Sequence, residues 1–264
     1  MDLEIALKVM RGAVTEAGEM LLAFQPEVEK LSSSKDFLTD ADLKSEEIIL
    51  ASLQKEYPDT PVFSEEKCGE AITNGFLWVI DPVDGTINYF LQDDHWEVSI
   101  ALVENGKTVA GVVYLPAKDL LFYASQRVLT KVYFAEWECS EVLKVNKQSN
   151  LKDCQIWLDW GKEENAGADH EKVYRVIKKL DQATLYPQIR NSCTSDMLTV
   201  AMGKIAGYVF PKPEPFDIAA AGLIVECAGG KVTDMEGNAW SPFSKSLVAT
   251  NGKIHGELID LLNS

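Results

Sequence analysis

Apolar residues recur at intervals of three and four along the first 24 residues, as they do on one face of an amphipathic helix. The stripe consists of Leu3, Leu7, Met10, Val14, Ala17 and Leu21. A helix is therefore expected over 3–24, followed by a polar break at 32–35. A second helix should end near Glu56, because Tyr57-Pro58 disfavours its continuation. Asp40 or Asp42 would be the N-cap of this second helix.

The pattern changes to short strands beyond residue 60. The run Phe76–Ile80 is continuously apolar between Gly75 and Pro82, which indicates a buried strand. Asn105-Gly106 is a strong signal for a hairpin turn. Strands are predicted over 61–63, 76–80, 98–104, 108–115 and 120–124. The last three predict an antiparallel meander with two helices packed against it.

Strands and helices alternate in the second half, which favours a sheet covered on both faces. The predicted strands span 155–158, 185–189, 207–210, 232–233 and 248–250. The predicted helices lie near 173–180, 194–202 and 217–227, with a last one ending at Leu262. The segment 138–152 is polar and weakly patterned. We therefore predict an N-terminal α+β subdomain over 1–145 and a smaller C-terminal mixed α/β subdomain over 146–264.

The composition limits the partners of the chain. Its 264 residues carry 25 Lys and Arg against 41 Asp and Glu, a formal net charge of −16. Such a surface repels nucleic-acid polymers and anionic membranes, so neither is expected as a partner. No apolar run approaches the roughly 20 residues of a membrane span. The five cysteines are scattered without a C-x-x-C pair. We expect them to be small, buried apolar residues in a reducing cytoplasm and not zinc ligands.

The chemistry points to the turn Asp81-Pro82-Val83-Asp84-Gly85-Thr86, which follows the buried strand directly. Pro82 fixes one backbone angle and Gly85 permits a tight reversal, so Asp81 and Asp84 point into one small volume. Two carboxylates this close favour a cation between them or a shared proton. Their hard oxygens suit Mg²⁺, Ca²⁺ or Mn²⁺. The alternative is a plain turn in which Asp81 caps Thr86.

Three blocks occur in a characteristic order: Glu65-Glu66, the 81–86 turn, and Phe216-Asp217-Ile218-Ala219-Ala220-Ala221-Gly222. Together they resemble the inositol monophosphatase superfamily, which comprises lithium-sensitive, Mg²⁺-dependent phosphatases of small molecules. The resemblance runs from Lys35 to the end. It implies the layered αβαβα sugar-phosphatase fold of the α+β class. Haloacid-dehalogenase-type phosphatases are a poor alternative, because their D-x-D-G-T motif differs in spacing from the D-x-x-D found here.

The resemblance also implies residue roles and a cofactor of two or three Mg²⁺ ions. It assigns metal ligation to Glu65, Asp81, the Val83 carbonyl, Asp84 and Asp217. The backbone N–H groups of Gly85 and Thr86 would bind phosphate. Asp42 and Thr86 would orient the attacking water, with Glu65 as a further catalytic residue. Two ions of this kind can activate water and neutralise the leaving oxygen.

The substrate pocket departs from the family pattern. Cys193 and Asp196 replace small residues in the segment 190–196, and Phe210 stands where inositol-specific members have a glutamate. An aromatic ring at 210 would stack on a base, and Lys212 would meet a second phosphate, unless this is only a proline-stiffened surface loop. The best interpretation is an inositol monophosphatase-like phosphomonoesterase, with a homodimer as the oligomer common in the family. A 3′(2′),5′-bisphosphate nucleotidase and a non-catalytic binding module are the alternatives.

Overall fold

The computed structural model describes residues 1–24, 40–66, 69, 72, 74–126, 128–134, 139–159 and 169–264. The helices are α1 (Leu3–Ala23), α2 (Asp40–Glu56), α3 (Thr86–Phe90), α4 (Asp169–Ala183), α5 (Cys193–Ala201), α6 (Pro215–Cys227) and α7 (His255–Asn263). Short 3₁₀ turns lie at Pro116–Lys118 and Leu151–Asp153. No helix in these ranges is long and apolar enough to cross a membrane.

Seven strands form the larger sheet, in the same order as in the sequence. They are β1 (Val62–Ser64), β2 (Phe76–Asp84), β3 (Glu97–Glu104), β4 (Lys107–Leu115), β5 (Leu120–Ser125), β6 (Val128–Phe134) and β7 (Cys139–Val142). From β2 onward every neighbour pairs antiparallel, as the predicted meander requires. Strand β1 pairs parallel with β2. At the β3–β4 turn, Asn105 and Gly106 both have positive φ, which matches a hairpin of the Asn-Gly type.

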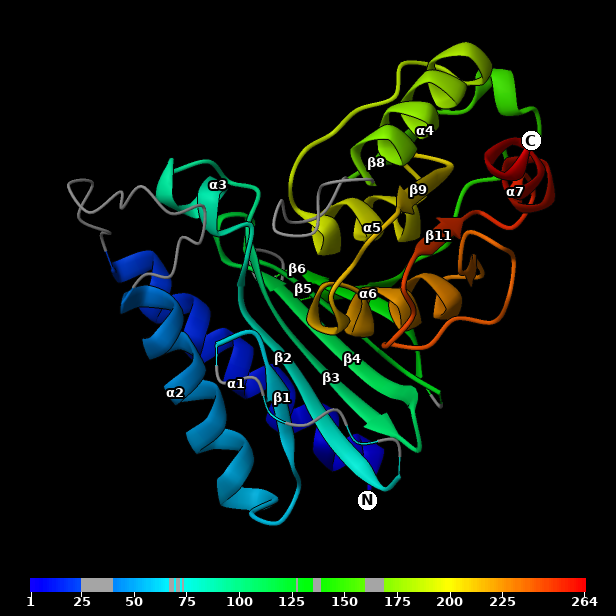
Figure 1. The fold of residues 1–264 in the computed structure, drawn as a ribbon. Helices are drawn as coiled ribbons and strands as arrows, with labels where there is room; N and C mark the ends of the chain where they lie inside the picture. The colour runs from blue at the N-terminus through cyan, green and yellow to red at the C-terminus, as the bar shows by residue number, and fades with distance from the viewer. Residues whose placement is uncertain are drawn as a thin grey trace.

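Four strands form the second sheet, in the order β10-β11-β9-β8. They are β8 (Ile156–Leu158), β9 (Gly207–Phe210), β10 (Lys231–Thr233) and β11 (Leu247–Thr250). Strands β8 and β9 are parallel and the other pairs are antiparallel, so the sheet is mixed as predicted. Figure 1 shows the resulting layers: α1 and α2, the large sheet, α5 and α6, the small sheet, and finally α4 and α7. The αβαβα layering is thus confirmed.

Alternate residues of β2 serve two different cores. Trp78 and Ile80 are buried against α1 and α2, whereas Leu77 and Val79 are buried in the cluster that contains α5 and α6. That second cluster also includes Tyr208 of β9 and other residues of the small sheet. The segments on the two sides of the predicted 145/146 boundary therefore share one apolar interior.

The structure differs from the predicted elements at three places. The expected strand over 185–189 is wrong: it is reduced to one parallel bridge between Trp157 and Gln188, because Pro187 has no N–H and Tyr186 has φ of +46°. Strands β6 and β7 were not predicted. Helix α2 begins at Asp40, so Asp42 lies inside its first turn and is not its N-cap.

Candidate metal and phosphate site

The parallel pairing of β1 with β2 brings Glu65 beside Asp81. Ser64 lies opposite Ile80 in the ladder, and the Glu65 N–H donates to the Ile80 carbonyl over 3.3 Å. Glu65 directly follows β1, and Asp81 lies next to it near the end of β2. Two segments separated in sequence therefore deliver their predicted ligands to one place.

The 81–86 motif, at the end of β2 and the start of α3, is held by hydrogen bonds between its own side chains and backbone. Asp81 Oδ1 accepts a hydrogen bond from the Val83 N–H at 3.1 Å, and Thr86 Oγ1 donates to the Val83 carbonyl at 3.0 Å. Gly85 occupies the N-cap of α3 with φ of +80°. A Cβ at this position would lie 2.8 Å from the His95 carbonyl oxygen, so glycine is required both by the backbone angle and by the space.

Helix α2 packs its first turn against the same motif. Ser45 Oγ donates to the Pro82 carbonyl at 2.8 Å. Asp42 lies three residues before Ser45, hence on the same helix face, and is 1% exposed. Burial, followed by the charge of Asp42, raises the pKa of Tyr89 to about 12. Asp42 is therefore an interior acid facing the motif.

Thr194, at the start of α5, connects two of the predicted ligands. Its N–H donates to Asp84 Oδ2 at 2.8 Å, and its Oγ1 donates to the Asp217 carbonyl at 3.0 Å. A second link is aromatic: the rings of Phe63 and Phe216 stack with centroids 6.3 Å apart. Because Glu65 and Asp217 closely follow these two phenylalanines, the stack brings both acids to the same side of the large sheet.

Asp217 also caps its own helix. Its Oδ2 accepts from the Glu214 N–H at 2.7 Å, and the Glu214 side chain completes a capping box at the start of α6. Asp217 is therefore fixed at the third position of α6 by its own helix. Capping occupies one carboxylate oxygen, so it is compatible with ligation through the other.

Asp84 has a buried acidic neighbour, Glu97, which lies opposite it in the β2–β3 ladder. Burial raises the pKa of Asp84, while the Thr194 N–H lowers it. Burial, and then the charge of Asp84, raise the pKa of Glu97 well above its usual value. Glu97 was missed at the sequence level. The only signal was an acid directly beside the apolar strand that begins at Val98.

No three of the predicted ligand side chains, all of which lie in the described ranges, bring their oxygens within 4.8 Å of one another. Among the described residues, three ligand atoms within 4.8 Å of one another occur only at Asp93, Asp94 and His95. His95 Nδ1 lies 2.5 Å from Asp93 Oδ1 and 2.9 Å from Asp94 Oδ1, and its Nε2 contacts Arg190 Nη2. Both ring nitrogens are thus engaged by side chains, so we assign these exposed acids to a surface network.

The two predicted specificity residues, Phe210 and Lys212, differ in their exposure to solvent. Phe210 is 4% exposed and packs edge-to-face on Tyr208, with centroids 6.2 Å apart. A ring buried in this way offers no face for stacking on a base. Lys212 is partly exposed in the short connection between β9 and α6.

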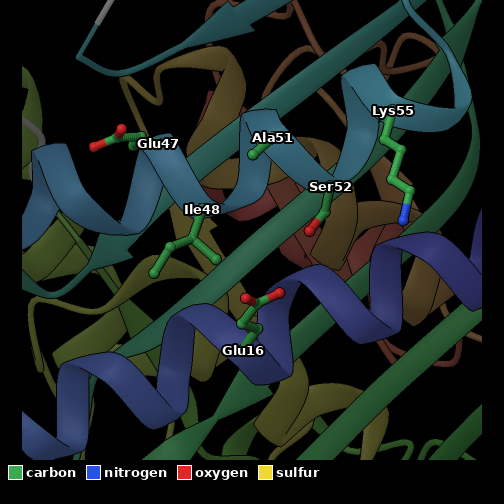
Figure 2. Close-up of a pocket in the computed structure, with 6 residues that line it drawn as sticks. All are labelled: Glu16, Glu47, Ile48, Ala51, Ser52 and Lys55. Atoms are coloured by element: carbon green, nitrogen blue, oxygen red, sulfur yellow. The ribbon is translucent and has the colours of Figure 1, made fainter.

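One surface hollow of about 380 Å³ lies between α1 and α2, away from these residues. Figure 2 shows Glu16 of α1 facing a row of α2 side chains, from Glu47 to Lys55. A second hollow of about 720 Å³ lies where α1 meets Tyr114 and Leu121. Neither hollow contains a predicted site residue, so the site is defined by its polar contacts.

Proteins similar to this chain span its full length. A Thermotoga maritima protein named fructose-1,6-bisphosphatase/inositol-1-monophosphatase is 30% identical over 99% of this chain and 95% of its own. The Nus factor SuhB of Xylella fastidiosa is 32% identical over 94% and 91%. The structure of an inositol monophosphatase from Anabaena (Nostoc) superposes with a TM-score of 0.87, at 27% identity, over 100% of this chain and 97% of that one.

The match extends to the family as a whole. Residues 2–264 fit the model of the inositol monophosphatase family. This range includes the strand-and-turn motif at 81–86, the first turn of α2 and the capped start of α6. The chain therefore belongs to the inositol monophosphatase family.

Proposed function

We propose that this protein is a Mg²⁺-dependent phosphomonoesterase that hydrolyses a small phosphate ester, with inositol monophosphate as the first candidate substrate. The observation that carries the proposal is the pair of hydrogen bonds that Thr194 donates to the Asp84 carboxylate and to the Asp217 main-chain carbonyl. It joins the acid at the end of β2 to the acid at the start of α6, although 133 residues separate them (217 − 84). Thr194 thus holds the start of α6 beside the end of β2, as an ion shared by these two segments would need.

The residues at this place fit a hard divalent cation. Glu65, Asp81, Asp84 and Asp217 offer carboxylate oxygens, and Val83 offers a carbonyl oxygen; these are the donors that Mg²⁺ prefers. Asp81 and Asp84 are buried, and a buried carboxylate is costly without a compensating charge. Nearby, the buried side chains of Asp84 and Glu97 are hydrogen-bonded to each other. A bound divalent cation would supply the compensating charge for Asp81 and Asp84.

The bound Mg²⁺ would supply Lewis-acid polarisation of the phosphoryl oxygens and a more acidic water. The chain contributes the positioning. The N–H groups of Gly85 and Thr86 would orient the phosphate. Thr86 Oγ1 donates its own hydrogen to the Val83 carbonyl, so its lone pairs remain available to accept a hydrogen from the attacking water. Asp42, buried on the facing side of α2, would accept the other.

The names of relatives guide the choice of substrate. The Bacillus subtilis relative, 27% identical, is named inositol-1-monophosphatase, and the Thermotoga maritima relative carries a sugar-bisphosphatase name as well. We therefore place inositol monophosphate first and a sugar bisphosphate second. The nucleotidase alternative has less support, because Phe210 is buried.

A non-catalytic role has one specific argument in its favour, which is the name Nus factor carried by several relatives. The net charge of −16 argues against direct contact with a nucleic-acid polymer, and it leaves a protein partner open. Retention of all four predicted carboxylates favours catalysis, because an acidic cluster is costly to keep without a function. The homodimer and the cytoplasmic location are further parts of our proposal.

Phosphate release from inositol 1-phosphate, fructose 1,6-bisphosphate and 3′-phosphoadenosine 5′-phosphate tests the proposal, each with Mg²⁺ and with EDTA. We expect Mg²⁺-dependent turnover that is highest for inositol 1-phosphate. Asp81→Asn should lower kcat/KM by at least 100-fold, because the charge at the end of β2 is lost, whereas Asp59→Asn in an exposed loop should not. Absence of turnover on every ester, from a folded wild-type protein, would refute the enzyme and favour the binding module.

A further inference from the structure

We propose that Glu97 is a positioning residue that fixes both Asp84 and the start of α5, and so sets the Mg²⁺ affinity of the site. The inference rests on the proposed function. Glu97 is the first residue of β3 and is fully buried. It does not need to touch the ion for this role, because it acts through Asp84.

The hydrogen bonds of Glu97 go to the second half of the chain. Its Oε1 accepts from Ser192 Oγ at 2.8 Å and from the Ser195 N–H at 2.5 Å. Between these two donors, the Thr194 N–H binds Asp84 Oδ2 at 2.8 Å. Two neighbouring carboxylates therefore bind consecutive N–H groups at the start of one nine-residue helix.

The N-cap of α5 explains why this arrangement matters. Ser192 occupies the N-cap position, where a serine ordinarily accepts a hydrogen bond from the helix backbone, yet it makes no such bond. Its hydroxyl donates to Glu97 instead. The free N–H groups of the first turn are thus satisfied by Asp84 and Glu97 from the large sheet. The start of α5 is therefore capped by Asp84 and Glu97, at the predicted metal site, and not by its own N-cap side chain.

This exchange has a geometric consequence for Asp84. One of its oxygens is committed to Thr194, so the orientation of the other depends on where α5 begins. Glu97 holds that start through two contacts, on either side of Thr194. Without Glu97, the α5 terminus would lose two of its anchors and Asp84 would gain rotational freedom. Partners that orient a metal ligand in this way change metal affinity by roughly 10- to 100-fold when removed.

Magnesium titration of four variants by calorimetry tests the role directly. Glu97→Ala should raise the Kd for Mg²⁺ by about 10-fold or more. Glu97→Gln keeps an oxygen acceptor for Ser192 and Ser195, so its Kd should stay within about threefold of wild type. Ser192→Ala removes one of the two contacts and should fall between these values. Glu104→Gln, exposed at the opposite end of β3, should have no effect.

Measurements of stability and of kinetics distinguish the positioning role of Glu97 from a purely structural role. Leu258→Ala, in the α7 core far from the site, should lower Tm but leave the Mg²⁺ Kd unchanged. For Glu97→Ala, kcat should return to within about threefold of wild type at saturating Mg²⁺. If Glu97→Ala does not fold, Ser192→Ala and Glu97→Gln decide the question.

Two results would overturn the inference while sparing the proposed function: a Glu97→Ala Kd within twofold of wild type, or equal losses in Glu97→Ala and Glu97→Gln. The second result would mean that the charge matters and the position does not. A wild-type protein that binds no Mg²⁺ would instead refute the proposed function itself.

Discussion

Asp196 is an acid in the interior whose second oxygen, Oδ2, makes no hydrogen bond to the described residues. Burial, and next the charge of Asp159, raise its pKa to about 8, and Arg190 offsets only part of this rise. In the unfolded chain the same carboxyl ionises near pH 3.8. The folded state therefore holds one extra proton between these values, and its stability must fall as pH rises through that window.

Asp196→Asn should remove this dependence, because an amide carries no titrating proton. The stability gain of the variant over wild type should grow with pH from about 5 to 8, by at most about 1.4 kcal/mol per pH unit. Urea unfolding at several pH values measures it. Asp59→Asn, in an exposed loop, is the matched control. A gain that does not change with pH would mean that Asp196 is ionised in the folded protein.

At the residue scale, the sequence allowed prediction only of local chemistry. The turn at 81–86 was recognisable because Pro82 and Gly85 constrain the backbone within six residues. Glu97 and Thr194 were not, since their importance arises from contacts across 95 or more residues. The stacking role of Phe210 was inferred from its position relative to Asp217. The predicted strand over 207–210 places Tyr208 and Phe210 on one face, but the sequence does not show that this face is buried.

At the element scale, Gly85 lies where β2 passes into α3, and two separate constraints act on it. Gly85→Ala would have to adopt φ of +80° and would bring Cβ to 2.8 Å from the His95 carbonyl oxygen. We expect a loss of about 1–3 kcal/mol in unfolding free energy, together with a weaker Mg²⁺ site. Chemical denaturation and Mg²⁺ titration measure the two effects.

Gly75→Ala is the control for Gly85→Ala. Gly75 has φ of +81°, but no other atom lies near the added Cβ. It should show the cost of the positive φ alone, with no effect on Mg²⁺ binding. Equal losses in both variants would show that the His95 contact is not a constraint.

At Gly111 of β4, the backbone of α6 lies close to the large sheet. An added Cβ would lie 2.8 Å from the Ala220 carbonyl oxygen, which is backbone and can move only with the helix. Gly111→Ala should therefore destabilise the protein by about 1–3 kcal/mol and displace α6, which carries Asp217. Gly12→Ala, in α1 with open space around it, should be neutral or stabilising. Thermal unfolding of both variants distinguishes these outcomes.

Elements defined by interactions between residues close in sequence were predicted correctly, and those defined by distant contacts were not. The β3–β4 hairpin was predicted because Asn105-Gly106 encodes its turn locally. The segment 185–189 is apolar enough to suggest a strand, yet Pro187 prevents more than one bridge to β8. Strands β6 and β7 were not predicted: Val128–Phe134 shows no regular alternation of apolar and polar residues, and β7 lies in the polar, weakly patterned segment 138–152.

At the scale of the whole molecule, the site and the core both combine the two halves. The central cluster contains β2 and β4 residues of the large sheet together with Tyr208 and Ala249 of the small sheet. The proposed ligands come from the residue after β1, from β2 and from α6, and α5 binds two acids of the large sheet. Both the folding transition and ligand binding should therefore involve the entire chain at once.

Mg²⁺ should consequently stabilise the whole protein in a single transition. A ligand that binds only the folded state adds about 2.7 kcal/mol at 100 times its Kd. For a chain of this length, that corresponds to a rise in Tm of roughly 5 °C. Calorimetry should show one peak that moves upward with Mg²⁺.

Asp81→Asn is the control, and its Tm should hardly respond to Mg²⁺. Its net charge of −15 nevertheless attracts divalent ions about as strongly as the −16 of wild type. An equal rise in both proteins would indicate general screening of the acidic surface. Two peaks, of which only one moves, would show that the halves unfold separately despite their shared core.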